Sequence, residues 1–288
     1  MPATTLVNRE AAPAALVTGA GSGIGEACAQ RLSRLGWRVF AGVLDETQRA
    51  HVEQSRLERV TPIVLDITKA DAIAAAVETI AAEVGQRGLA GLVNNAGIGV
   101  VGPVELVPID RLRHQLEVNL IGHVAVTQAC LPLLRKATGR IVYISSLAGR
   151  LSIPLLSPYS ISKFGIEAVS DALRQELRPW KMHVACIEPA LINTPILSST
   201  DAAADAAFAA MSEEGRGLYG SFFNRLKTAT DMRAAAQPPD VVARAVAHAL
   251  TARKPKTRYV VGGMRWQFLL LSKLPDRLRD WVIAKQFG

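Results

Sequence analysis

The sequence predicts a single α/β domain in which a parallel, seven-stranded sheet carries helices on both faces, the doubly wound arrangement. Three observations predict this fold. Short apolar runs without polar alternation recur along the chain, as expected of strands that are buried on both faces. Longer segments with apolar residues at helical spacing separate most of these runs. A glycine-rich stretch, residues 18–25, follows the first run and opens the first helix.

The expected elements alternate in order along the chain. Seven strands are expected within residues 14–20, 38–44, 60–68, 89–97, 139–149, 182–190 and 258–263. Helices are expected within residues 25–36, 69–85, 109–136 and 157–180. With right-handed connections between parallel strands, we expect one domain over residues 1–288 and the strand order 3-2-1-4-5-6-7.

Residues 194–237 interrupt this alternation with helical but loosely patterned sequence. A segment inserted after the sixth strand lies at the carboxyl edge of the sheet, where it is expected to enclose the substrate. A surface excursion without such a role is the alternative.

Residues 264–288 form an amphipathic extension, in which tryptophan, phenylalanine and leucine alternate with arginine and lysine. Such a segment can pack on the domain, cap the substrate pocket, contact a partner subunit or lie on an anionic membrane surface. A helix packed on the domain is the favoured interpretation, and peripheral membrane contact stays open.

Composition narrows the class of protein. The formal net charge is +8, but the basic residues are spread along the chain and form no run of five, so no nucleic-acid partner is expected. Three separate cysteines and five scattered histidines predict neither a disulfide framework nor a metal site. The N-terminus lacks the pattern of a signal peptide, and we expect a cytoplasmic location.

The glycine-rich stretch reads Thr-Gly-Ala-Gly-Ser-Gly-Ile-Gly. Glycine permits a tight turn and leaves no Cβ in the way of a phosphate. The following helix offers free backbone N–H groups and a positive dipole end to an anion. The stretch therefore predicts a site for a dinucleotide pyrophosphate, made by Thr18, Gly19, Gly21, Ser22, Gly23, Ile24 and Gly25.

Tyr159 and Lys163 stand four residues apart near the start of an expected helix, so their side chains point to the same side. This spacing alone fits an aromatic ring beside a solvated charge. It also fits a tyrosine whose proton is made available by a fixed cation. A free tyrosine has a pKa of about 10 and is a poor base near neutral pH, so the second interpretation needs the cation.

Several motifs together resemble the short-chain dehydrogenase/reductase family over residues 14–194. They are residues 18–25, Asn94–Gly97, Asn119, Ser146, and Tyr159 with Lys163. Ser146 lies thirteen residues before Tyr159, which is the usual separation in that family. Residues 38–46, 88–97 and 130–149 further resemble the branch of retinol and hydroxysteroid dehydrogenases.

The resemblance implies a Rossmann-fold oxidoreductase whose catalytic residues are Asn119, Ser146, Tyr159 and Lys163. Tyr159 is then the base in alcohol oxidation and the acid in carbonyl reduction. Ser146 is expected to bind the substrate oxygen, and Lys163 to favour the tyrosinate and hold the cofactor ribose. Asn119 is expected to hold a water in a proton path. A buried asparagine satisfied by backbone is the alternative.

The resemblance also implies contacts with a nicotinamide cofactor. Asp66 and Ile67 are expected beside the adenine, although Asp66 can instead cap a helix. Ala190 follows Pro189 where the family usually has glycine. The remaining implied contacts are Asn95, Ala96, Gly97, Tyr159, Lys163, Pro189, Ile192 and Thr194.

The cofactor is expected to be NAD, with NADP as the alternative. Binding of the 2′-phosphate of NADP needs a cation, and neither Ser22, Val43 nor Leu44 supplies one. Asp45 offers a carboxylate to the 2′-hydroxyl of NAD, although it lies two residues beyond the commonest acidic position in the family.

We therefore expect an enzyme that interconverts a lipophilic secondary alcohol, steroid- or retinoid-like, and its carbonyl. The family resemblance further implies a homodimer or homotetramer. The alternative is a dinucleotide-binding sensor or scaffold protein without turnover. The presence of all four catalytic residues argues against that alternative.

Overall fold

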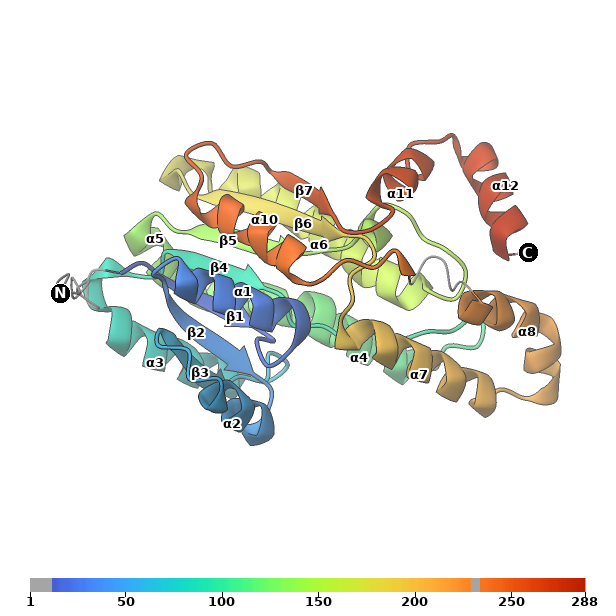
Figure 1. Ribbon diagram of the computed structural model, residues 1–288, viewed down its shortest axis with the longest axis horizontal. Coiled ribbons are helices and arrows are strands. Elements are labelled where there is room, and N and C mark those ends of the chain that lie inside the picture. Colours follow the sequence, from blue (N-terminus) through green and yellow to red (C-terminus); the bar gives the residue numbers. More distant parts are fainter. Residues whose placement is uncertain (1–11, 229–233, 288) are drawn as a thin grey trace, which may run out of the picture.

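The centre of the fold is a seven-stranded parallel sheet (Figure 1). This computed structural model describes residues 12–228 and 234–287, so the N-terminal residues 1–11, where no signal peptide is expected, lie outside it. The strand order β3-β2-β1-β4-β5-β6-β7 confirms the predicted order. The strands are β1 (Ala14–Thr18), β2 (Arg38–Val43), β3 (Val60–Val64), β4 (Gly91–Asn94), β5 (Arg140–Ile144), β6 (His183–Pro189) and β7 (Arg258–Val261).

Helices cover both faces of the sheet, because successive side chains of each strand point to opposite sides. Leu16 and Val17 of β1 are both fully buried but belong to different hydrophobic cores. The core with Val17 includes α1 (Gly23–Arg34) and α10 (Asp240–Thr251). The core with Leu16 includes α3 (Ala70–Val84), α5 (Gly122–Ala137) and α6 (Ser157–Glu176).

Two helices, α2 (Glu46–Gln54) and α10, lie outside the expectations from the sequence. α2 buries only Val52, so it leaves no apolar stripe that could have predicted it. α10 buries Val242, Val246 and Leu250 at helical spacing, a pattern that the sequence does contain.

The helix expected at residues 109–136 is interrupted. α4 (Ile109–Leu116) continues into a π turn, η3 (Glu117–Ile121), and then into α5. The combined stretch Ile109–Ala137 is long and apolar enough to cross a membrane by length and composition. In the fold it packs against the sheet, with Val126 and Cys130 of α5 fully buried in the second core.

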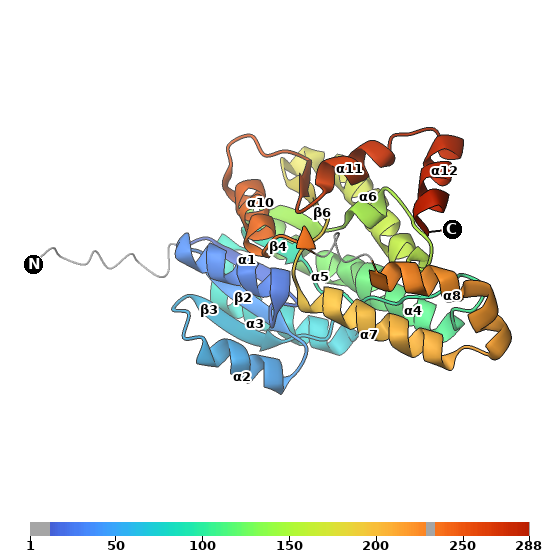
Figure 2. The same cartoon turned by 45° about the vertical axis from the view of Figure 1, so that its right-hand side comes forward.

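The predicted insertion forms two helices beyond the carboxyl ends of the strands, α7 (Pro195–Ala210) and α8 (Glu213–Thr228) (Figure 2). A small separate core holds them. Ala204 of α7 and Phe223 of α8 pack with Val101, which follows β4, and with Leu155, which precedes α6. The insertion is thereby anchored to the loops that surround the sheet's carboxyl edge.

The C-terminal extension forms α11 (Arg265–Leu271) and α12 (Asp276–Phe287). Ile283 of α12 packs with Leu151 and with Phe222 of α8, so the extension lies on the domain. Trp266 and Trp281 remain 65% and 55% exposed. Contact of this surface with a membrane or a partner subunit stays a prediction.

Candidate active site

A cavity of about 600 Å³ opens at the carboxyl edge of the sheet, between the strand ends and the insertion. It brings together most of the predicted site residues. Those that line it are Gly19, Ser22, Gly23, Ile24, Asp66, Ile67, Asn95, Ala96, Gly97, Ser146, Tyr159, Lys163, Pro189, Ile192 and Thr194. The predicted site residues outside the lining are Thr18, Gly21, Gly25, Asp45 and Asn119.

The glycine-rich turn follows β1 and packs tightly against the neighbouring strand end. Gly19 has a φ of +63°, and a Cβ on it would lie 2.7 Å from the Cα of Ala96. A Cβ on Gly25 would lie 2.1 Å from the carbonyl oxygen of Gly19. Larger residues at either position would push the turn away from β4, so these glycines set the shape of the cavity floor.

Thr18 and Asn95 lock the turn to the end of β4. The Thr18 hydroxyl accepts hydrogen bonds from the backbone N–H groups of Asn95 (2.9 Å) and Ala96 (3.1 Å). The Asn95 side chain donates to the carbonyl oxygens of Thr18 (2.9 Å) and Gly19 (3.1 Å). Thr18 is fully buried, so it acts behind the cavity as a support and not as a direct ligand.

Asp66 lies on the cavity wall after β3, and its carboxylate accepts hydrogen bonds from the Thr68 backbone (2.9 Å) and hydroxyl (2.7 Å). Burial raises its pKa, but the hydrogen bonds from Thr68, together with nearby Lys69 and His114, outweigh burial and lower the pKa below its usual range. Asp66 therefore presents a carboxylate at neutral pH. It does not cap α3, whose N-cap residue is Lys69.

The structure does not bring Asp45 into the cavity. Asp45 is the N-cap residue of α2, and its carboxylate accepts a hydrogen bond of 2.9 Å from the Gln48 backbone. Leu44 and Gln48 line the wall in its place. The Gln48 side chain accepts a hydrogen bond of 3.1 Å from the Leu44 backbone. The short carboxylate is thus used locally to begin a helix.

Asn119 is fully buried at the π turn. Its side chain accepts from the Ile98 N–H (2.9 Å) and donates to the Ile98 carbonyl (2.9 Å), with a further bond of 3.3 Å to the Ser162 hydroxyl. These contacts match the alternative of an asparagine satisfied largely by backbone. They fix the loop after β4 that lines the cavity.

Ser146, Tyr159 and Lys163 meet on one wall. Ser146 lies two residues after the end of β5, at the start of a short 3-10 turn (Leu147–Gly149). Tyr159 and Lys163 lie on the first turns of α6. The Lys163 Nζ lies 5.5 Å from the centre of the Tyr159 ring and donates a hydrogen bond of 2.9 Å to the Ile144 carbonyl. Lys163 is only 3% exposed, so the pair is not the surface pair that the spacing also allowed.

The charges of these groups differ in part from the expectation. Burial raises the pKa of Tyr159 to about 12, and a hydrogen bond with Ser146 acts in the opposite direction. Burial lowers the pKa of Lys163 to about 8, while Cys186 and Glu167 raise it. Lys163 is not among the groups that shift Tyr159. The residues of this chain alone therefore keep Tyr159 protonated at neutral pH, contrary to the expected lowering of its pKa by Lys163.

Two buried side chains that the sequence analysis missed also support the cavity. Gln115 accepts from the Val100 N–H (2.6 Å) and donates to the Ile98 carbonyl (2.7 Å). His123 lies 2.7 Å from the Ala96 carbonyl through Nε2, and burial is the main cause that lowers its pKa to about 3. A neutral His123 must donate from Nε2, because a carbonyl only accepts. His123 stands among the mostly apolar residues of α5, which is a signal in the sequence, whereas Gln115 lies among the charged residues of α4 and gives none.

The outer part of the cavity is apolar. Ile98, Val100, Leu156 and Ala190 line it. The insertion contributes Pro195, Ile196, Leu197 and Thr200. The described residues contain no cluster of three or more His, Cys, Asp or Glu side chains that could hold a metal ion.

The family of the chain follows from comparison with known proteins. A family model described as short chain dehydrogenase matches residues 13–205. The chain belongs to the short-chain dehydrogenase family. This short-chain dehydrogenase is an NAD(P)-dependent oxidoreductase of the retinol and hydroxysteroid dehydrogenase branch.

Several relatives match this short-chain dehydrogenase over most of its length. Retinol dehydrogenase 16 of Mus musculus is 39% identical over 276 residues, which cover 93% of this chain and 86% of the relative. 17-beta-hydroxysteroid dehydrogenase type 6 of Bos taurus is 36% identical over 286 residues, with coverage of 94% and 87%. NADPH-dependent 3-dehydrocapnine reductase of Ornithobacterium rhinotracheale is 37% identical over 278 residues, with coverage of 94% and 96%.

Solved structures have the same fold. A short-chain dehydrogenase from Streptomyces avermitilis superposes with a TM-score of 0.76 at 26% identity, covering 96% of this chain and 97% of that one. A 3-ketoacyl-(acyl-carrier-protein) reductase from Brucella melitensis, complexed with NADH, gives 0.71 at 27% identity, covering 88% and 98%. An actinorhodin polyketide ketoreductase variant with NADPH gives 0.73 at 27% identity, covering 88% and 97%.

The cavity of this short-chain dehydrogenase fits the dinucleotide that its family uses. Ser22, the N-cap residue of α1, makes no side-chain capping bond, so the first N–H groups of that helix are available to an anion. The glycine turn leaves this end open, and Asp66 and Ile67 line the cavity farther along the sheet edge. A bound nicotinamide cofactor would supply or accept the hydride.

Proposed function

We propose that this protein interconverts a lipophilic secondary alcohol and its carbonyl by hydride transfer, with Tyr159 as the proton carrier. One observation carries the proposal. Tyr159 and Ser146 lie in a single cavity that has a glycine turn suited to pyrophosphate at one end and apolar side chains at the other. The retinol and hydroxysteroid dehydrogenases among its relatives support a steroid- or retinoid-like substrate.

The proposed roles follow from the geometry. In carbonyl reduction, the Tyr159 hydroxyl donates its proton to the substrate oxygen, and its high pKa keeps that proton available at neutral pH. The Ser146 hydroxyl, which interacts with Tyr159, holds the same oxygen in reach. In alcohol oxidation, the buried Lys163 cation is close enough to stabilise the developing tyrosinate.

A coupled screen tests the function. Purified protein is incubated with NAD or NADP and a panel of lipophilic secondary alcohols, or with the reduced cofactors and the matching ketones, and nicotinamide absorbance is followed. We expect turnover with at least one steroid- or retinoid-like pair. Cofactor binding without turnover across the whole panel would favour the sensor or scaffold protein instead.

We propose NAD as the preferred cofactor, because no basic side chain is among Leu44, Gln48 and Ser22 on the wall nearest the end of β2. Relatives and solved structures use both NADH and NADPH, so the chain's own residues carry this proposal. We expect kcat/KM to be about tenfold or more higher with NAD, since one missing charge-assisted contact is worth about 1.5–3 kcal/mol. A higher kcat/KM with NADP would contradict the proposal.

We also propose a homo-oligomer formed through α6 and the π turn. Ile161 and Phe164 of α6 are 48% and 46% exposed, and Ile121 of the neighbouring π turn is 49% exposed. An exposed apolar group of this kind is typical of subunit interfaces. In sedimentation velocity we expect a dimer or tetramer, and a smaller species for Phe164→Asp. Leu35→Asp, at an exposed apolar site on α1's C-cap, should sediment like the parent; a monomeric parent excludes the proposal.

A further inference from the structure

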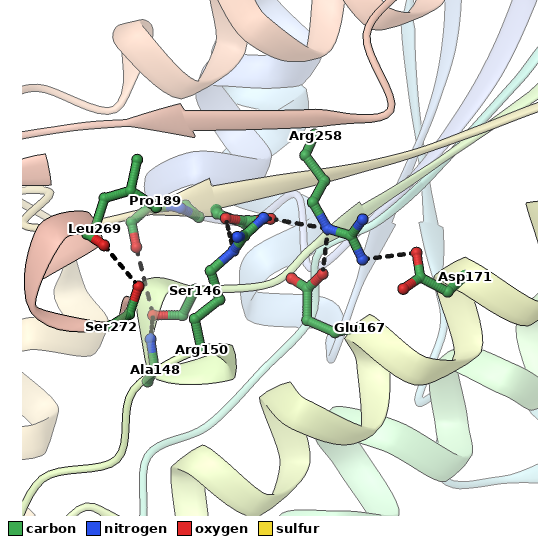
Figure 3. Close-up of polar contacts among 10 residues, drawn as sticks. Ser146, Ala148, Arg150, Glu167, Asp171, Pro189, Arg258, Leu269 and Ser272 are labelled. Carbon is green, nitrogen blue, oxygen red and sulfur yellow. Dashed lines mark hydrogen bonds and ion pairs between the residues drawn. The ribbon is translucent and has the colours of Figure 1, made fainter. Parts of the chain in front are cut away.

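A chain of partly buried ion pairs lies behind the wall that carries Ser146, Tyr159 and Lys163 (Figure 3). It joins the loop after β5, the strands β6 and β7, and helix α6. Three cations face three carboxylates, so the cluster is balanced in charge. Its members are Arg150, Arg174, Arg258, Glu167, Asp171 and Glu188.

Arg150 and Glu188 form the end of this cluster that lies nearest Ser146. Glu188 is fully buried on β6, and the Arg150 guanidinium grips it as a fork. Nη2 donates a hydrogen bond of 2.8 Å to Oε1, and Nε lies 2.6 Å from Oε2 in an ion-pair contact without hydrogen-bond geometry. A two-point contact between arginine and a carboxylate fixes orientation as well as distance.

This fork closes one end of the loop that carries Ser146. At the other end, the Ser146 hydroxyl donates a hydrogen bond of 3.4 Å to the carbonyl of Pro189, the residue after Glu188. Within the loop, the Ala148 N–H donates to the Ser146 hydroxyl (3.1 Å), and the Gly149 N–H donates to the Ser146 carbonyl (2.9 Å). Residues 146–150 are therefore clamped to β6 at both ends, as Figure 3 shows in part.

Arg258 extends the same clamp to α6. Its guanidinium lies 3.3 Å from Glu188 and 3.0 Å from Glu167, and it donates a bond of 2.6 Å to Asp171. Glu167 is one helical turn beyond Lys163. The cluster thus ties the loop of Ser146 to the helix that carries Tyr159 and Lys163.

We propose that Arg150, acting through Glu188, is a positioning residue that holds Ser146 in register with Tyr159. Arg150 does not line the cavity, so it touches neither substrate nor cofactor. This inference rests on the proposed function of Ser146 and Tyr159. A purely structural ion pair would change stability and leave the turnover of folded enzyme alone.

The test compares three variants of the full chain. Arg150→Met keeps the apolar stem and removes the fork, and we expect kcat to fall about 10- to 100-fold, since small misplacements of reacting groups have such effects. We expect its Kd for NADH to stay within about twofold of the parent. Arg150→Lys keeps the charge without the fork, so its unfolding temperature should recover while kcat stays low. Arg174→Met is the matched control, because Arg174 pairs with Asp171 at the far end of the cluster, and its kcat should be parental.

Parental kcat in Arg150→Met, or an equal loss of kcat in Arg174→Met, would overturn the inference. If Arg150→Met does not fold, Arg150→Lys decides in its place, and parental kcat there overturns the inference equally. Hydrogen exchange gives a readout that needs no turnover: the amides of Ala148 and Gly149 should exchange faster in Arg150→Met than in Arg174→Met. A parent without turnover on any substrate would sink the proposed function, whereas unchanged exchange in these amides would sink the clamp.

Discussion

Tyr159→Phe is expected to lower kcat by about 10²- to 10⁴-fold, the range typical of removing a general acid or base. The substitution removes one hydroxyl and leaves the ring, which packs beside the Lys163 ammonium. Burial keeps this hydroxyl protonated at neutral pH, so the parent enzyme holds a proton where a carbonyl oxygen would need it. Steady-state kinetics in the direction of carbonyl reduction measure the effect most directly.

Two controls isolate the chemistry of that hydroxyl. The Kd for NADH should change little in Tyr159→Phe, because the ring and Lys163 remain in place. Tyr259→Phe, on β7 and outside the cavity lining, should retain parental kcat. If Tyr159→Phe turned over at the parental rate, Tyr159 would not be the proton carrier, and the mechanism would need another acid.

Gly19→Ala is expected to weaken NADH binding by at least about tenfold and to destabilise the fold. Its φ of +63° disfavours any side chain, at a cost of about 1–2 kcal/mol. In addition, the new Cβ would lie 2.7 Å from the Cα of Ala96, which cannot move without disturbing β4. The glycine turn would shift, and with it the N–H groups that would hold a cofactor pyrophosphate. Isothermal titration with NADH and urea unfolding measure the two effects.

Gly36→Ala separates backbone strain from close approach. Gly36 also has a positive φ, +83°, but a Cβ on it would meet nothing within 4 Å. It ends α1 away from the cavity, so we expect a loss of about 1–2 kcal/mol in stability and a parental Kd for NADH. Equal effects of the two substitutions on the Kd would show that the contact between the turn and β4 does not shape the site.

The fold was largely predictable because its signals are local and repeated. Strands buried on both faces read as unbroken apolar runs, and the parallel order follows once helices separate them. Ser146 and Lys163 come together because strand ends and helix starts share one edge of a parallel sheet. A short motif such as Tyr-x-x-x-Lys gained meaning only from its position in that series.

Three features of the site could not be predicted from the sequence: the role of Asp45, the pKa of Tyr159, and the partners of Gln115 and His123. A carboxylate such as that of Asp45 can bind a ribose or cap a helix. In the structure it accepts a hydrogen bond of 2.9 Å from the Gln48 backbone N–H and so caps α2. The pKa of Tyr159 depends on how deeply it is buried, which outweighs the hydrogen bond with Ser146. Gln115 and His123 are buried polar side chains whose partners are backbone atoms more than ten residues away in the sequence.

The π turn between α4 and α5 explains how a single helix can bind that backbone along its length. Gln115, Asn119 and His123 all hold residues 96–100. In an unbroken α-helix, the eight-residue step from Gln115 to His123 would place them about 80° apart around the axis; the extra residue of the π turn reduces this to about 20°. The π turn therefore brings the three side chains onto one face of the helix, where each binds the backbone of residues 96–100. Without the extra residue, Gln115 would point away from this backbone, and only Asn119 and His123 would still bind it.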